Sequence, residues 1–183
     1  SINLFNKSLS YGKYNNSLMA RATYWRGEAE YRSGRYDAAR DDFEVFLGMP
    51  GASRLEEFAL ARYNLAYSLF NFQNYSGALT HFRGFESGAV NVKPEILADT
   101  KIRIADCYFI TTNYPMAISY YDKVIEAGNT DADYAMYQKG FCLGLSNNQK
   151  GKIDIMTSLI SRYPNSTYVA SAIFERGRAY LVM

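Results

Sequence analysis

Apolar residues along the chain recur at spacings of three and four, which is the pattern of one buried helical face. The stretch GRYDAARDDF at residues 34–43 shows this pattern with an aromatic residue, an alanine and a second aromatic residue. The same arrangement returns in QNYSGALTHF from Gln73 and in TNYPMAISYY from Thr112. An arrangement that returns at regular steps indicates a repeat architecture.

The repeats align on three columns, which hold a tyrosine, an alanine and an aromatic residue. Successive copies lie 39, 39 and 35 residues apart. The columns read Tyr36, Tyr75, Tyr114 and Gln149; Ala39, Ala78, Ala117 and Lys152; and Phe43, Phe82, Tyr121 and Met156. Three copies agree, and the fourth departs from the pattern at Gln149 and Lys152.

A second helix precedes each of these stretches and carries a column of small residues. This column reads Gly27, Ala66, Ala105, Gly140 and Gly177. The flanking columns hold mainly aromatic residues: Tyr24, Tyr63, Ile102, Tyr137 and Phe174 before it, and Tyr31, Phe70, Phe109, Gly144 and Leu181 after it. Small residues would let neighbouring backbones approach. A leucine at Gly27 or Ala78 is therefore expected to overpack the interior and to destabilise the protein by about 1–3 kcal/mol.

Each unit is therefore predicted to be a helical hairpin: helix A carries the small column, and helix B begins at the tyrosine. A hairpin cannot bury its apolar face alone, so the units are expected to stack. The predicted fold class is all-α, an α-solenoid of stacked antiparallel helical hairpins without strands. The predicted helices span residues 2–10, 16–33, 36–47, 53–72, 75–87, 94–112, 115–127, 131–147, 150–162 and 167–182.

Capping residues fit these boundaries. Glycine can take the left-handed conformation that ends a helix, and the first three B helices are predicted to end at Gly48, Gly88 and Gly128. The sequence SRLE at residues 53–56 is predicted to be a capping box that opens the next helix. Pro94 and Pro115 fit first helical turns, and Pro164 falls in a loop.

The chain is predicted to be a single domain, residues 1–183, cut from a longer array. Residues 1–19 are expected to end a preceding repeat, and residues 170–183 to form the first helix of a truncated one. The repeats between them are predicted at residues 20–58, 59–97, 98–132 and 133–169.

A hairpin repeat with a small residue in its first helix, a tyrosine at the turn, and an alanine and an aromatic residue in its second resembles the tetratricopeptide repeat. The resemblance covers residues 20–183, and the fourth unit matches least because of Gln149 and Lys152. It implies a non-enzymatic scaffold that binds a protein segment. The two-carboxylate clamp of chaperone-binding tetratricopeptide proteins is not reproduced, so a chaperone C-terminus is disfavoured as ligand.

A narrower resemblance lies at LISRYPNSTYVASAIFERGRAYL, where Tyr163, Pro164 and Ser166 precede a helix with Ala172 and Gly177. It is similar to the repeats of bacterial envelope proteins, the Tol-Pal coordination factor and the outer-membrane assembly lipoproteins. This resemblance implies a periplasmic or outer-membrane-associated location, with a cytoplasmic one as the alternative.

Composition narrows the range of partners. With 48% hydrophobic and 21% charged residues, the 183-residue chain has a globular composition. Its 20 basic and 18 acidic residues are scattered, so nucleic acid is a poor partner. No apolar run approaches the roughly 20 residues that cross a bilayer, so no direct membrane insertion is expected in this segment. The 17 tyrosines suit a surface that is partly buried and partly wet.

The residues do not point to an enzyme, a metal site or a cofactor. His81 is the single histidine and has no partner at ligand spacing, so a half-exposed surface position is expected. Cys107 and Cys142 occupy equivalent places where other units hold alanine or serine, which predicts packing rather than a disulfide. Adjacent Asp41 and Asp42 are expected to be solvated near a helix N-terminus.

The concave side of such an array is lined by the A helices, so the partner-binding groove is predicted there. Aromatic residues are suited to anchor a partner because rigid rings supply contact area at low entropic cost. Tyr24, Tyr63 and Tyr137 belong to the repeating stripe and are expected mainly to pack between helices. The candidate groove residues are Tyr24, Glu28, Tyr31, Tyr63, Tyr67, Asp106, Phe109, Tyr137, Phe141 and Arg178.

Four of these candidates, Glu28, Tyr67, Asp106 and Phe141, differ from unit to unit at one equivalent place. Residues that vary where the scaffold repeats are the better candidates for choosing a partner. Two further functions stay open: a self-assembling solenoid, which would be a homo-oligomer, and an interaction module of a larger enzyme or regulator.

Overall fold

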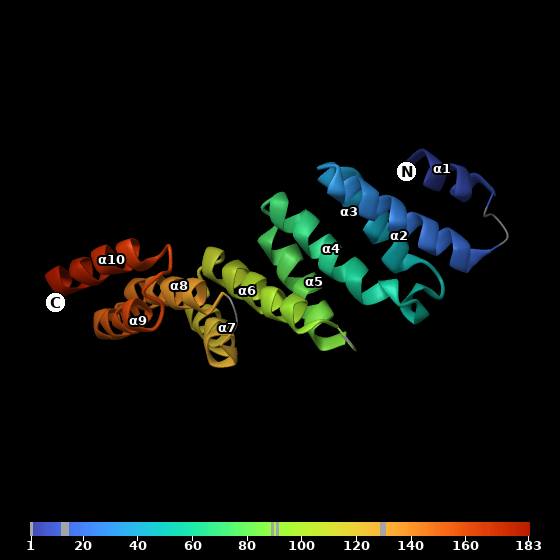
Figure 1. Cartoon of the computed structure of the whole chain (residues 1–183). Helices are drawn as coiled ribbons and strands as arrows, with labels where there is room; N and C mark the ends of the chain where they lie inside the picture. The colour runs from blue at the N-terminus through green and yellow to red at the C-terminus, as the bar shows by residue number, and fades with distance from the viewer. Residues whose placement is uncertain (1, 12–14, 89, 91, 129–130) are drawn as a thin grey trace. The chain divides into compact units, whose positions relative to one another are not determined.

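The computed structural model describes residues 2–11, 15–88, 90, 92–128 and 131–183. These residues form α-helices, one short 3₁₀ helix and turns, and no strand (Figure 1). The predicted all-α fold class is therefore confirmed. The chain divides into two compact units, Ser1–Asn91 and Val92–Met183.

The first unit contains two full hairpins and a preceding helix. Its elements are α1 (Ile2–Tyr11), α2 (Asn16–Arg32), α3 (Tyr36–Gly48), the 3₁₀ helix η1 (Ala52–Arg54), α4 (Glu57–Asn71) and α5 (Tyr75–Gly88). Helix α2 packs on α3, and α4 packs on α5 and on α3. The predicted A and B helices of the first two repeats are thus present.

The second unit contains two more hairpins and a final A helix. Its elements are α6 (Pro94–Ile110), α7 (Tyr114–Ala127), α8 (Ala132–Leu145), α9 (Gln149–Arg162) and α10 (Val169–Val182). Each helix packs on the next along the chain. Pro94 and Pro115 lie in first turns and Pro164 lies in a turn, as predicted.

The turns inside the four hairpins share one backbone geometry. Each has a left-handed residue at the same position of the repeat, with φ of 77° at Gly34, 59° at Gln73, 63° at Thr112 and 60° at Asn147. The amide of the following residue then bonds the carbonyl five residues back, as from Asn148 N to Leu143 O at 2.8 Å. The fourth repeat therefore keeps the common turn geometry although its sequence departs from the columns at Gln149 and Lys152.

Pairs of aromatic rings close the first three hairpins across these turns. The ring centroids lie 5.2 Å apart for Tyr31 and Tyr36, 5.2 Å for Phe70 and Tyr75, and 6.1 Å for Phe109 and Tyr114. The fourth hairpin has Gly144 and Gln149 at these two positions. There the Gln149 side-chain amide donates a hydrogen bond to the Gly144 carbonyl at 3.3 Å. A single hydrogen bond thus replaces the contact between two aromatic rings.

The interior is formed by the columns that the sequence predicts. Ala39, Ala78 and Ala117 are fully buried, and so are Phe43, Phe82, Tyr121 and Met156. The small column brings helices A and B together, because a Cβ atom on Gly27 would lie 3.0 Å from Asp42 Cβ and 3.0 Å from Phe43 Cε1. Gly177 has open space instead.

The predictions about helix ends are confirmed in part. The SRLE segment is not a capping box, because η1 occupies residues 52–54 and α4 begins at Glu57 without a side-chain cap. Helices α3 and α5 end at Gly48 and Gly88 as predicted, but neither glycine adopts the left-handed φ expected of a cap. Gly128 does adopt it, with φ of 65°. The prediction that Asp42 is solvated also fails: it is buried and receives two hydrogen bonds from Arg26, at 2.5 and 2.7 Å.

Candidate partner-binding surface

The A-helix surface of the first unit is occupied by contacts within the fold. Glu28 on α2 accepts a hydrogen bond from Asn64 Nδ2 on α4 at 2.6 Å and pairs with Arg32 at 2.7 Å. The hydrogen bond from Asn64 joins the successive A helices α2 and α4, whereas the pair with Arg32 lies within α2. Because the Glu28 side chain is only 16% exposed and both its oxygens are used, it stabilises the repeat junction and has little capacity left for a partner.

The tyrosines of this unit pack against the B helices. Tyr24 is buried, with its ring centroid 5.9 Å from Phe43 and 5.5 Å from Phe46. Burial, reinforced by the nearby carboxylate of Glu28, raises the pKa of the Tyr24 phenol. Tyr63 and Tyr67 are half-buried, and both rings contact Phe82. The rings of Tyr63 and Tyr67 therefore contribute mainly to packing in the core.

Asp106 on α6 is the centre of a buried polar network in the second unit. Its carboxylate is 6% exposed and accepts hydrogen bonds from Tyr121 Oη at 2.7 Å, Tyr134 Oη at 2.9 Å and Arg103 at 2.8 Å. Burial raises the pKa of Asp106, although the hydrogen bonds and the Arg103 charge oppose this. The network ties α6 to α7 and α8, which is a structural role.

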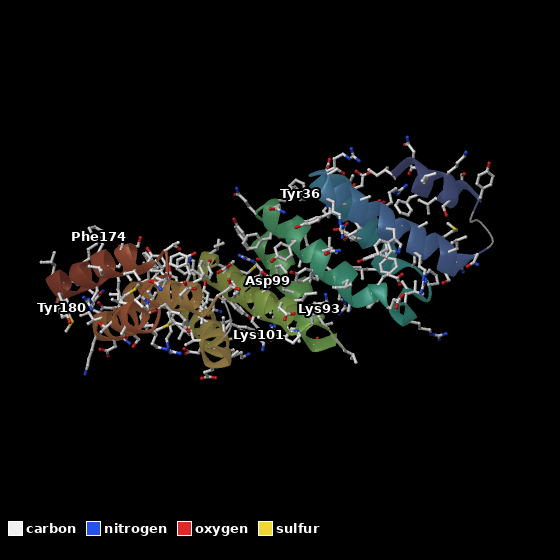
Figure 2. All side chains as sticks on the ribbon, viewed as in Figure 1. Tyr36, Lys93, Asp99, Lys101, Phe174 and Tyr180 are labelled. Carbon is white, nitrogen blue, oxygen red and sulfur yellow. The ribbon has the colours of Figure 1, made fainter. Side chains whose placement is uncertain are left out.

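A polar cavity of about 430 Å³ opens beside this network. Carboxylates dominate it, around the single guanidinium of Arg103. We call it the acidic pocket; it is lined by Asp99, Ile102, Arg103, Asp131, Asp133, Tyr134 and Tyr168. The rings of Tyr134 and Tyr168 lie 5.8 Å apart at one side of it. Figure 2 shows Asp99 on α6.

A second cavity of about 260 Å³ lies where the fourth hairpin lacks its aromatic pair. We call it the fourth-hairpin pocket; it is lined by Phe141, Gly144, Leu145, Gln149, Lys152, Glu175, Arg178, Ala179 and Val182. Lys152 Nζ donates to Glu175 Oε2 at 2.6 Å, and Arg178 donates to Glu175 Oε1 at 3.1 Å. Lys152 and Glu175 are both buried, with side chains 10% and 8% exposed.

The two pockets lie along one face of α8. Tyr134 lines the acidic pocket, and Phe141 and Leu145 line the fourth-hairpin pocket. Residues seven and eleven positions apart lie on the same side of an α-helix, and seven residues span about 10 Å. An extended chain of three or four residues could therefore reach from one pocket to the other.

The structure brings only part of the predicted groove set together. Phe141 and Arg178 line one pocket, while Tyr24 and Asp106 are buried and cannot contact a partner in this conformation. The half-buried members are Glu28, Tyr31, Tyr63, Tyr67, Phe109, Tyr137 and Phe141. Tyr31 and Phe109 belong to the aromatic pairs at the turns, and Tyr137 stacks on Tyr168 at 5.1 Å.

Several pocket residues are absent from the predicted set. Lys152 and Gln149 stand out in the sequence as departures from the columns, and this departure is the signal that could have identified them. Glu175 and Tyr134 give no such signal, because their roles depend on which helices pack together.

The two cysteines and the histidine lie in packed parts of the fold. Cys107 and Cys142 are buried free thiols, and burial raises the pKa of each to about 12. His81 is half-buried, and burial lowers its pKa. Among the residues that the structure describes, no group of histidine, cysteine and carboxylate side chains could hold a metal ion. Nor is any helix in this part of the chain long and apolar enough to cross a membrane.

Known structures share this fold. The chain superimposes on YrrB, described as a tetratricopeptide-repeat protein with an unusual peptide-binding site, with a TM-score of 0.73 and 15% identity over 100% of this chain and 84% of that one. A C-terminal part of a repeat protein from Cytophaga hutchinsonii gives 0.70 and 21%, covering 97% and 63%. MamA gives 0.69 and 15%, covering 87% and 85%. No curated protein sequence is similar enough to count as a relative.

Stacked hairpins with a shared turn and a small-residue column define a helical-repeat protein. Residues 2–54 and 134–166 match sequence models of the tetratricopeptide repeat. Both matched segments are therefore tetratricopeptide repeats, and the chain shares the fold of the tetratricopeptide-repeat structures above. This repeat fold supports a role as a protein-interaction scaffold.

Proposed function

We propose that the chain binds an extended segment of a partner protein along the A-helix face of its second unit. The observation that carries this proposal is the pair of pockets on one face of α8, which are lined largely by residues outside the repeating columns. Residues that build every hairpin cannot distinguish partners, whereas nearly all of the pocket residues differ from their equivalents in the other hairpins. The peptide-binding site described for YrrB supports a peptide as the class of ligand.

The two pockets differ in charge, which would fix the direction of the bound segment. The acidic pocket holds Asp99, Asp131 and Asp133 around Arg103, so it favours a basic side chain. The fourth-hairpin pocket holds Lys152 and Arg178 around one carboxylate, so it favours an acidic group. A segment with both charges a few residues apart would bind in one orientation only.

A peptide library selected on the purified chain tests this proposal. Leu145 lies at the fourth-hairpin pocket with 57% exposure, and Leu145→Arg is expected to weaken the selected peptide about tenfold or more by blocking the pocket. Met116 on α7 is 38% exposed and outside both pockets, so Met116→Arg is the matched control. Equal loss in both variants, or in neither, would contradict the proposal.

The cellular location of the scaffold is also a proposal. The similarity of residues 159–181 to bacterial envelope repeats supports a periplasmic or outer-membrane-associated position. Fractionation of the organism that produces the full-length protein tests it. Recovery in the cytosolic fraction would contradict this location without affecting the peptide-binding proposal.

Self-assembly is the second candidate function, and one observation favours it. Helix α10 exposes Phe174 by 65% and Leu181 by 89%, in columns that hold mostly buried or half-buried residues in the other A helices (Figure 2 shows Phe174). We propose Phe174→Lys with Leu181→Lys as its test in sedimentation equilibrium. If self-assembly uses this face, the parent chain shows a mass that rises with concentration and the variant does not; a monomeric parent contradicts it.

A further inference from the structure

The fourth-hairpin pocket exists because two large side chains are replaced together. Gly144 and Gln149 occupy the positions of an aromatic pair whose rings touch in each of the other three hairpins. The space that a ring would fill is retained as a cavity of about 260 Å³. Since the turn beneath it keeps the common backbone geometry, with φ of 60° at Asn147, the cavity is not the result of a distorted hairpin.

Lys152 lines this cavity, and its position depends on the absence of a side chain at residue 144. It replaces the buried alanine of the other B helices, and a Cβ atom on Gly144 would lie 3.0 Å from Lys152 Cδ. Its ammonium lies 5.5 Å from the centroid of the Phe141 ring. Gly144, Gln149 and Lys152 therefore form one set of linked changes, which line a pocket with an aromatic wall and a cation.

The two cations of the pocket have hydrogen-bond donors that Glu175 does not use. Both oxygens of Glu175 are used, one by Lys152 and one by Arg178. An ammonium carries three donors and a guanidinium five, so each cation retains donors beyond its bond to Glu175. Two cations around one carboxylate leave a net positive charge that a second carboxylate could neutralise.

We propose that the fourth-hairpin pocket receives an aromatic side chain of the partner that is accompanied by a carboxylate. The ring takes the place of the missing aromatic pair against Phe141 and Leu145, and the carboxylate binds Lys152 and Arg178. This inference rests on the proposed function and names what the partner segment presents at one end. An aromatic residue at the C-terminus of the partner, or one beside an acidic residue, supplies both groups.

N-acetyl-L-tyrosine is the probe, because it carries a ring and one carboxylate. Its binding is expected with a dissociation constant on the order of 1 mM, as for a fragment of this size. NMR shifts of the Gly144 backbone amide and the Gln149 side-chain amide report it. N-acetyl-L-tyrosine amide should bind about fivefold more weakly, because it lacks the charge. N-acetyl-L-alanine, which lacks the ring, should give no saturable shift.

Restoring the repeat sequence should abolish binding. The variant Gly144→Phe, Gln149→Tyr, Lys152→Ala rebuilds the aromatic pair of the other hairpins, and at least a tenfold loss of N-acetyl-L-tyrosine affinity is expected with helicity retained. Since this triple change could impair folding, Arg178→Gln provides a second test at a side chain that is 62% exposed. Because Lys152 remains, this variant should reduce the preference for the acid over the amide.

Three results would overturn the inference: no shift of the two reporter amides at tenfold the expected dissociation constant, equal binding of acid and amide to the parent chain, or undiminished binding by the folded triple variant. These failures are distinct from failure of the proposed function. A selected peptide that is still weakened by Leu145→Arg but not by Met116→Arg would keep the A-helix face as the binding surface and exclude only the aromatic acid.

Discussion

The small-residue column can be tested with two identical substitutions at equivalent positions. Gly27 on α2 and Gly177 on α10 occupy the same place in the repeat. A Cβ atom on Gly27 would lie 3.0 Å from Asp42 Cβ and 3.0 Å from Phe43 Cε1, whereas one on Gly177 has no neighbour within 4 Å. Alanine should therefore destabilise the protein at Gly27 and stabilise it at Gly177.

The magnitude follows from two opposing contributions. Alanine in place of glycine inside a helix stabilises by about 1 kcal/mol. Overpacking costs about 1–3 kcal/mol, and the upper part of this range applies at Gly27 because neither neighbour can move readily. Phe43 is fully buried, and Asp42 is fixed by two hydrogen bonds from Arg26. We expect a net loss of about 1–2 kcal/mol for Gly27→Ala and a gain of up to about 1 kcal/mol for Gly177→Ala.

Each unit carries its own reporter for this comparison. Trp25 is the single tryptophan and lies in α2, so its fluorescence follows urea unfolding of the first unit. The buried thiols Cys107 and Cys142 report opening of the second through their labelling rate. With an m-value of about 1 kcal/mol/M, Gly27→Ala should lower the Trp25 midpoint by about 1–2 M. A midpoint equal to or above that of the parent would refute the close packing at this column.

Three further predictions concern strain, charge and thiol burial. Thr112→Asn should raise the free energy of unfolding by about 1 kcal/mol and Asn147→Thr lower it similarly, since a β-branched residue is strained at the left-handed φ of 63° and 60°; urea midpoints that move the other way refute this. Burial would raise the pKa of Glu175, but the hydrogen bonds and charges of Lys152 and Arg178 outweigh it and lower this pKa. The contribution of ionised Glu175 to stability should be complete at pH values above its unfolded pKa of about 4.3. It should be lost as the pH falls from there through the lower folded pKa. Glu175→Gln should therefore flatten the dependence of thermal stability on pH in this range. Because burial raises the pKa of Cys107 and Cys142 to about 12, native protein at pH 8 should resist iodoacetamide that labels both after unfolding; rapid native labelling contradicts their burial.

The repeating part of the fold was predictable from the sequence because each column repeats a physical requirement. Ala39, Ala78 and Ala117 must all admit a neighbouring helix, and three copies reveal the requirement better than one. The helix boundaries at Pro94 and Pro115 follow from chemistry that acts within one turn. Packing requirements that recur in every repeat, and capping requirements that act within one helical turn, can therefore be predicted from the sequence.

Features that depend on a single packing event were not predictable in this way. The left-handed residue of the turns is glycine only at position 34, so Gln73 and Thr112 give no local signal for it. Asp42 looked solvated because its partner Arg26 is 16 residues away on another helix. The SRLE segment has the composition of a capping box, but the 3₁₀ helix at residues 52–54, with Ala52 fully buried, determines the local backbone.

The candidate site shows the same division. Phe141 and Arg178 were found because the groove was expected on the A helices, and Lys152 was visible as a departure from its column. The pairing of Lys152 with Glu175 joins α9 to α10 across 23 residues of sequence and requires the folded arrangement. Asp106 varies between units as a partner-contacting residue would, yet it serves a buried network, so variability alone does not separate the two roles.

Mapping a selected peptide onto the chain by NMR tests the central claim most directly. If the partner segment binds along this face, amide shifts should concentrate on α8 from Tyr134 to Leu145 and on the facing residues of α6 and α10, with the exposed residues of α7 and α9 unchanged. Shifts centred on α7 and α9, or on the first unit, would contradict binding along the A-helix face of the second unit.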